Sequence, residues 1–119
     1  MLLVDDDRDS SEALSDFLST EGFEIQCAVN GQEVLGLLAN HQYRPELILL
    51  DLAMPVLDGW GFLAERRKDP QLADIPVVIV TSSPDATQKA KQAGAVAVLR
   101  KPVDPQTLLR IIDHFAERA

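Results

Sequence analysis

Five short apolar runs recur along the chain, separated by segments with helical patterns. The runs are Leu2 to Val4, Phe23 to Val29, Leu47 to Leu50, Val77 to Val80 and Ala95 to Leu99. Four of them are nearly continuous in valine, isoleucine and leucine, as strands covered on both faces are. Strands that alternate with helices imply a parallel sheet with right-handed crossovers. The pattern therefore predicts an α/β protein, (βα)5, in which a doubly wound, five-stranded parallel sheet carries helices on both faces.

The helical segments carry residues that favour helix ends. Asp9 and Glu12 have the spacing of a capping box, which predicts a first helix from about Asp9 to Thr20, and Gly22 ends it. The other four helices are expected after Asn30-Gly31, over roughly Gly59 to Lys68, over Pro84 to Ala93, and from Asp104-Pro105 onward. One helix thus follows each expected strand.

Length and composition favour one domain, residues 1–119, in the cytoplasm. A chain of 119 residues can bury roughly two thirds of its unfolded surface. It contains no apolar stretch near the roughly 20 residues of a membrane span and opens with no signal-peptide pattern, so we expect no membrane partner. The single cysteine, Cys27, lies in an apolar stretch, and we expect it to be a buried free thiol.

The charge balance excludes one class of partner. The formal net charge is −8, from 19 acidic residues against 11 lysines and arginines. Direct nucleic-acid binding needs protein cations that displace the counterions of the phosphates. We therefore expect no direct nucleic-acid contact by this chain.

Polar residues follow four of the five apolar runs. They are Asp5 and Asp6 after the first run, Asp51 after the third, Thr81 after the fourth, and Lys101-Pro102 after the fifth. In open parallel sheets, ligands bind beyond the carboxyl ends of the strands, where the strand order reverses. We therefore expect these side chains to share one edge of the sheet.

The chemistry of that edge predicts phosphoryl transfer with a divalent cation. Three carboxylates facing one lysine leave two negative charges unbalanced, which is unfavourable in a partly desolvated pocket unless a cation binds. Oxygen ligands without histidine or cysteine favour Mg²⁺, with Mn²⁺ possible, over zinc. Asp51 can act as a nucleophile and form an aspartyl phosphate, while Thr81 offers a hydroxyl and Lys101 a point charge to the phosphoryl group.

In order and spacing these residues resemble the receiver domains of two-component response regulators. The motifs are the acidic pair Asp5-Asp6, the segment Asp51 to Gly59, Thr81, and Lys101-Pro102, and the resemblance spans the whole chain. It implies a flavodoxin-type, CheY-like sheet with strand order 2-1-3-4-5. It also implies that Asp51 takes a phosphoryl group from a histidine kinase or a histidine phosphotransfer protein.

The resemblance further implies a role for each site residue. Asp6, Asp51 and the main-chain carbonyl of Ala53 would bind Mg²⁺, and Asp5 would act through water. Thr81 and Lys101 would contact the phosphoryl group.

The resemblance also implies that the Lys101–Pro102 peptide bond is cis, a form accessible mainly to X-Pro bonds. It further implies how a signal would leave the site. The signal would reach a downstream effector protein, or a covalently linked output domain, through the face formed by the last two helices and the strand between them.

At two positions the chain carries valine where the common receiver pattern has an aromatic residue. Val98 stands three residues before Lys101, where receivers usually carry an aromatic residue, and Val103 replaces the aromatic residue common after Lys-Pro. A valine has no ring to swing inward, so the aromatic part of the switch is missing. We expect loop movement and movement of the Pro84 to Ala93 helix to carry the signal instead.

Two other functions share parts of this pattern. An aspartate-nucleophile phosphohydrolase of the haloacid-dehalogenase type also forms an aspartyl phosphate, but it needs a second aspartate at the position of Ala53. A flavodoxin-like cofactor binder needs a phosphate-binding loop where Asp5-Asp6-Asp7 would repel phosphate. We therefore expect a signalling switch that catalyses only its own phosphorylation and slow self-dephosphorylation, and not an enzyme.

Overall fold

Strands and helices alternate along the chain, as the apolar runs predict. The computed structural model describes residues 1–5, 7–39, 43–51, 59–82 and 86–115. The strands are β1 (Leu2–Val4), β2 (Gln26–Ala28), β3 (Ile48–Asp51), β4 (Val77–Thr81) and β5 (Ala97–Arg100). The helices are α1 (Arg8–Thr20), α2 (Gly31–Ala39), α3 (Gly59–Lys68), α4 (Pro70–Ala73), α5 (Ala86–Gln92) and α6 (Pro105–Phe115).

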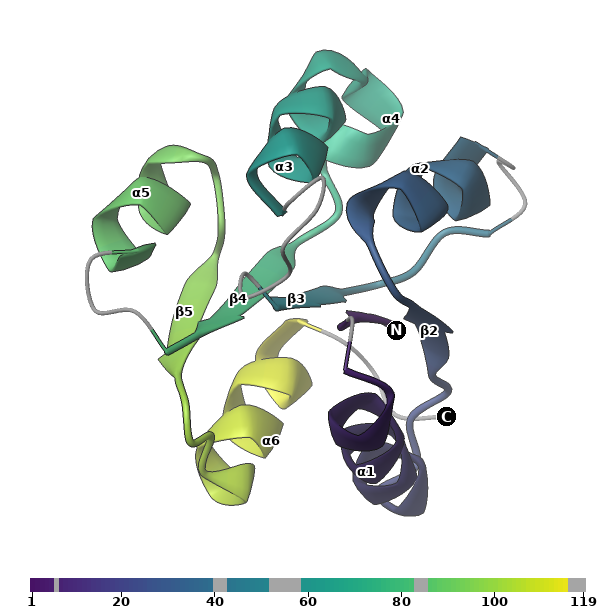
Figure 1. The fold of residues 1–119 in the computed structure, drawn as a ribbon, viewed down its shortest axis with the longest axis vertical. Coiled ribbons are helices and arrows are strands. Elements are labelled where there is room, and N and C mark those ends of the chain that lie inside the picture. The colour runs from purple at the N-terminus through teal and green to yellow at the C-terminus, as the bar shows by residue number, and fades with distance from the viewer. Residues whose placement is uncertain (6, 40–42, 52–58, 83–85, 116–119) are drawn as a thin grey trace.

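The five strands form one parallel sheet in the order β2-β1-β3-β4-β5, which confirms the predicted fold class. Helices α1 and α6 cover one face, and α2, α3, α4 and α5 cover the other (Figure 1). The chain runs from β1 outward to β2 and then returns to place β3 on the other side of β1. The strand order therefore reverses between β1 and β3, and their carboxyl ends define the expected ligand edge.

The core consists of two layers because successive strand residues point to opposite faces. Ile48 and Leu50 of β3 pack in the cluster under α2, α3 and α5, whereas Leu49 packs in the cluster with Leu18 of α1 and Ile112 of α6. All three β3 residues are fully buried. The continuous apolar runs thus reflect strands that are covered on both sides.

Several helix ends follow the sequence signals, and the start of α1 does not. Asp104 caps α6 by accepting a hydrogen bond from the Thr107 main chain, and Asn30 caps α2 in the same way. The predicted capping box of Asp9 and Glu12 is wrong, because the side chain of Asp7 accepts hydrogen bonds from the main chain at the start of α1. The helix consequently begins one residue before Asp9. The expected start of α5 at Ser83-Pro84 lies outside the described residues.

The prediction of a buried Cys27 is also wrong. Cys27 is exposed, because β2 is an edge strand and two of its three residues face solvent. Hydropathy alone predicts burial of Cys27, since its neighbours in sequence are apolar. The short helix α4 was likewise not expected. None of the helices in the described ranges has the length and hydropathy needed to cross a membrane.

Candidate functional site at the carboxyl edge of the sheet

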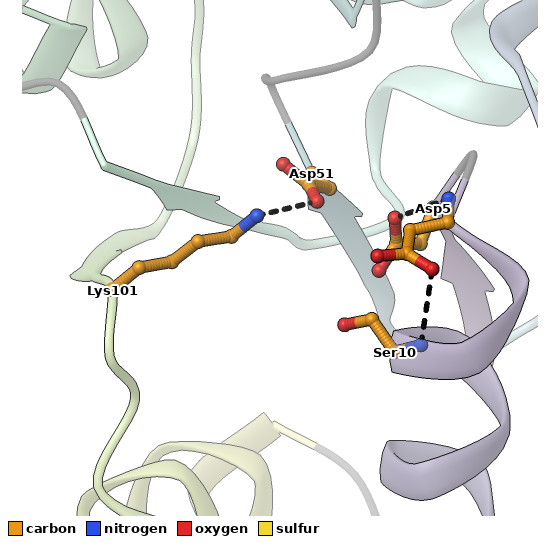
Figure 2. A network of polar contacts seen from close by, with 5 residues as sticks. Asp5, Ser10, Asp51 and Lys101 are labelled. Atoms are coloured by element: carbon orange, nitrogen blue, oxygen red, sulfur yellow. Dashed lines mark hydrogen bonds and ion pairs between the residues drawn. The ribbon is translucent and has the colours of Figure 1, made fainter.

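The sheet register brings the two described acidic residues of the site together. Val4 of β1 pairs with Leu50 of β3, so Asp5 and Asp51 occupy the next positions on neighbouring strands. Both residues are buried, with 5% and 6% of their surfaces exposed. Figure 2 shows them side by side at the strand ends, with Lys101 reaching toward Asp51 from the other side. The predicted convergence at one edge therefore occurs for these three residues.

Lys101 forms an ion pair with Asp51. Its Nζ lies 2.7 Å from Asp51 Oδ2, and the side chains are 36% and 7% exposed respectively. The main-chain N–H of Lys101 donates a hydrogen bond to the Thr81 carbonyl (2.9 Å), which attaches this lysine to the end of β4. The Lys101–Pro102 peptide bond is cis, as the resemblance implies. Lys101 therefore presents a mobile positive charge to a carboxylate fixed at the end of β3.

Asp5 lies in an environment that disfavours its charge. Burial is the main cause that raises the pKa of its carboxyl, and the negative charge of Asp51 raises it further. The main-chain N–H of Asp7 opposes this shift by donating to Asp5 Oδ1 at 2.9 Å. Two adjacent buried carboxylates with one ammonium group leave an unbalanced negative charge, which a bound cation would neutralise.

The donor set fits a hard divalent cation. Asp5 and Asp51 supply carboxylate oxygens, the ligands that Mg²⁺ prefers, together with water. The other expected ligands, Asp6 and the Ala53 carbonyl, lie outside the described residues. Within the described part of the chain, no three histidine, cysteine, aspartate or glutamate side chains converge as a metal cluster. What the structure offers is thus a pair of carboxylates that a cation with a water shell can bridge.

Thr81 ends β4 beside this pair. Asp51 pairs with Val80 across the β3–β4 ladder, and Thr81 follows by one residue, with 4% of its surface exposed. Val98 pairs with Ile79 and packs, half-buried, against the core under α2, α3 and α5. The side chain at this position is therefore a valine packed against the core, where receivers usually carry an aromatic residue.

Asp7 and Ser10 contribute to the site in a way that the sequence interpretation missed. Asp7 caps α1 and orients Asp5 through its own N–H, and the side chain of Ser10 lowers the pKa of Asp5 as an additional hydrogen-bond partner. Ser10 faces the Asp5–Asp51 pair from the first turn of α1 (Figure 2). The available signal was residue type, because aspartate is among the residues preferred at a helix N-cap and Asp7 directly precedes α1.

Comparison with known proteins identifies the family. The family model described as response regulator receiver domain matches residues 1–113. The protein PilH of Pseudomonas aeruginosa is 36% identical over 95% of this chain and 93% of its own length. The chemotaxis response regulator CheY4 of Vibrio cholerae superposes with a TM-score of 0.85 at 32% identity, covering 97% of this chain and 96% of CheY4. The chain therefore belongs to the response regulator receiver domains.

Other relatives are longer than this chain. A probable transcriptional regulator, ycf29 of Pyropia yezoensis, is 35% identical over 99% of this chain but only 53% of its own length. The ycf29 protein of Porphyra purpurea is matched over 56% of its length. The chain thus spans about half the length of these two relatives. The family match gives no support to the phosphohydrolase alternative.

Proposed function

We propose that this receiver is switched by phosphorylation of Asp51 by a histidine kinase or a histidine phosphotransfer protein. One observation carries the proposal: a buried carboxylate at the switch point of the sheet lies 2.7 Å from a lysine ammonium group and beside a second carboxylate. Such an arrangement of an oxygen nucleophile and a fixed cation suits phosphoryl transfer, in which catalysis is mainly positioning and charge neutralisation.

The transfer step has a simple balance. A carboxylate oxygen of Asp51 attacks the phosphorus of a phosphohistidine, an O–P bond forms, and the N–P bond breaks with its electron pair returning to the donor imidazole. Lys101 Nζ forms an ion pair with Asp51 Oδ2 before transfer. Because its side chain is long and partly exposed, it could follow the negative charge from the carboxylate to the phosphoryl oxygens. The Thr81 hydroxyl would donate a hydrogen bond to the same group.

Mg²⁺ would be held by Asp6, Asp51 and the Ala53 carbonyl, with Asp5 acting through a bound water. When bound, it supplies positive charge to the transferred phosphoryl group. Asp5 contributes a carboxylate whose own charge is disfavoured by burial, so cation binding relieves an unfavourable interaction at this position. Self-dephosphorylation by water would return the chain to its starting state, which makes it a switch and not a conventional enzyme.

The phosphorylated state would be read through the face formed by α5, β5 and α6. Lys89 and Lys91 on α5 and Arg100 on β5 are exposed there and give this face a positive character in a chain of net charge −8. The partner would be a downstream effector protein or a linked output domain, in the cytoplasm. A relative of Synechocystis that is 35% identical, RpaA, is a DNA-binding transcriptional regulator, which supports an output of the second kind.

Intact mass after incubation with acetyl phosphate and Mg²⁺ tests the acceptor assignment. The wild type should gain the mass of one phosphoryl group, and Asp51→Asn should gain none. Asp104→Asn is the matched control, because Asp104 is an exposed capping aspartate outside the site. A wild type that stays unlabelled while another receiver is labelled under the same conditions would refute the proposal.

A further inference from the structure

Strand β2 is an open edge of the sheet, since within the described residues it pairs with β1 alone. The main-chain N–H of Gln26 donates to the Met1 carbonyl at 3.0 Å. The carbonyl of Ala28 accepts a hydrogen bond from the Asp5 main chain, also at 3.0 Å. Because alternate residues of a strand direct their main-chain groups to opposite sides, the N–H and carbonyl of Cys27 face away from β1. Such groups at a sheet edge form a template for a further strand.

The side chains along this edge leave it accessible. Cys27 is exposed, and Val29, one residue beyond the strand, is 40% exposed. Ile25, one residue before the strand, is half-buried. Lysine and proline, which commonly protect edge strands from pairing, do not occur in the sequence from Phe23 to Asn30. The edge thus offers main-chain hydrogen bonds beside apolar side chains.

The charge around the edge is almost entirely negative. The segment between Arg8 and Arg44 contains no lysine or arginine but six aspartates and glutamates. It forms α1, β2 and α2, which lie together on one side of the molecule (Figure 1). The Met1 ammonium group donates to the Glu24 carbonyl at 2.9 Å and offsets one of these charges. The exposed acidic residues of the segment are Asp9, Glu12, Asp16, Glu24 and Glu33.

We propose that β2 binds an extended cationic segment of a partner protein, which adds to the sheet as a sixth strand. Hydrogen bonds to the Cys27 main chain would provide affinity, and lysines or arginines that alternate with apolar residues would match the acidic surroundings. A second copy of this chain would bring the same acidic helices to the contact and be repelled. The inference goes beyond the proposed function, because strand addition requires neither a phosphodonor nor Mg²⁺.

Fluorescence anisotropy with a labelled hexapeptide of alternating lysine and valine tests the proposal. At about 0.05 M salt we expect a dissociation constant of about 100 μM or lower, and weaker binding as the salt concentration rises. The hexapeptide of alternating glutamate and valine should bind at least about tenfold more weakly. The lysine peptide with every main-chain nitrogen methylated keeps its charge but cannot donate main-chain hydrogen bonds, and it should also bind at least about tenfold more weakly.

Variants of the chain locate the binding. Cys27→Pro removes the outward N–H and leaves the bonds of Gln26 and Ala28 to β1 in place, and it should weaken binding of the lysine peptide at least about fivefold. Glu24→Lys and Glu33→Lys should each weaken it at least about threefold. Glu65→Lys is the matched control, because it changes the net charge equally at an exposed site on α3, outside the acidic segment. Its affinity should stay within about twofold of the wild type.

The outcomes separate strand addition from its alternatives. No binding of the lysine peptide, equal binding of the methylated peptide, or wild-type affinity in a folded Cys27→Pro overturns the proposal. If Cys27→Pro does not fold, as judged by circular dichroism, the methylated peptide decides the main-chain contact. A wild type that sediments as a dimer while Cys27→Pro sediments as a monomer assigns the edge to a second copy, which also overturns the proposal. Phosphorylation of Asp51 is measured separately, so the two proposals can fail independently.

Discussion

Lys101 and Asp51 are 50 residues apart in sequence, yet Lys101 Nζ lies 2.7 Å from Asp51 Oδ2. The contact bridges the carboxyl ends of β3 and β5, with β4 between them. It is supported from β4, because the Thr81 carbonyl accepts a hydrogen bond from the Lys101 main chain. The carboxylate is buried while the lysine reaches it from a partly exposed position. Lys101 could therefore follow negative charge from Asp51 to a transferred phosphoryl group by moving its side chain alone.

Lys101→Met should slow phosphorylation while preserving the fold. The variant keeps a long side chain but removes the cation that faces the acceptor. Loss of one such electrostatic group typically costs on the order of 10²-fold in rate, and we expect a decrease of this size in labelling by acetyl phosphate. Lys91→Met, an exposed lysine on α5, is the control and should label at the wild-type rate. Equal rates in the two variants would contradict a role for Lys101 in the transfer.

The pH dependence of the free energy of unfolding should reveal the raised pKa of Asp5 in the folded protein. Burial and the neighbouring Asp51 raise its folded-state pKa above the ordinary value of 3.8, so the folded protein binds this proton more tightly than the unfolded chain. The free energy of unfolding should therefore fall as the pH rises from about 3.8 through the raised pKa, and level off above it. Urea unfolding of wild type and Asp5→Asn in EDTA measures this, and the variant should lose that part of the slope.

Asp104 provides a control of opposite sign. Hydrogen bonds from Thr107 hold its pKa below the ordinary value, so its contribution is present at neutral pH and is lost as the pH falls. Asp104→Asn should thus alter the slope in the direction opposite to Asp5→Asn. If both variants change the slope of unfolding free energy against pH in the same direction, the raised pKa assigned to Asp5 is wrong.

Mg²⁺ should stabilise the folded chain by an amount that grows with the logarithm of its concentration above the dissociation constant. A ligand that binds the folded state alone adds about 2.7 kcal/mol at a concentration of 100 times its dissociation constant. Differential scanning fluorimetry should show a rise in melting temperature with Mg²⁺ that EDTA reverses. The rise should vanish in Asp51→Asn and persist in Asp104→Asn. A rise of equal size in Asp51→Asn would show that the cation binds elsewhere.

Most of the architecture follows from periodicity. Continuous apolar runs define doubly covered strands, and the rule that ligands bind at the carboxyl ends of such strands groups Asp5, Asp51 and Lys101 before any distance is known. The contact between Lys101 and Asp51 depends on strand order, because β4 must lie between β3 and β5. That order came from the family resemblance, since helical and strand patterns alone do not specify which strands are neighbours.

Burial of single side chains and the choice of capping residue were harder to predict, because both depend on tertiary contacts. Cys27 has apolar neighbours but lies on an edge strand, so its burial depends on strand order and not on hydropathy. Asp7 caps α1 instead of Asp9, although only Asp9 is followed three residues later by a glutamate. Arg66 lies in the last turn of α3, where a basic side chain is favourable even when it faces solvent, yet it is only 4% exposed. A buried guanidinium can be recognised only when its carbonyl partners, which lie beyond the helix, are known.

Arg66 joins the end of α3 to the chain that leads into β4. Its Nε donates to the Ile75 carbonyl at 3.2 Å, and its Nη2 donates to the carbonyls of Ile75 (2.7 Å) and Ala73 (2.8 Å). These bonds hold the turn after α4 against the core, directly before the strand that carries Thr81. The adjacent Arg67 is exposed and donates to the Gln92 carbonyl at 3.2 Å. The two neighbouring arginines therefore allow a buried and an exposed set of hydrogen bonds to be compared by the same substitution.

Arg66→Met should destabilise the fold by about 3 kcal/mol, because two carbonyls lose buried donors and each such loss costs about 1–3 kcal/mol. Arg67→Met should cost less than about 1 kcal/mol, since its single bond is exposed and water can replace it. Urea unfolding followed by circular dichroism gives both values, provided that the slopes with denaturant agree between the variants. Destabilisation of equal size in the two variants would mean that the three hydrogen bonds of Arg66 contribute little, and that the turn after α4 is held by the packing of Leu72 and Ile75 in the core.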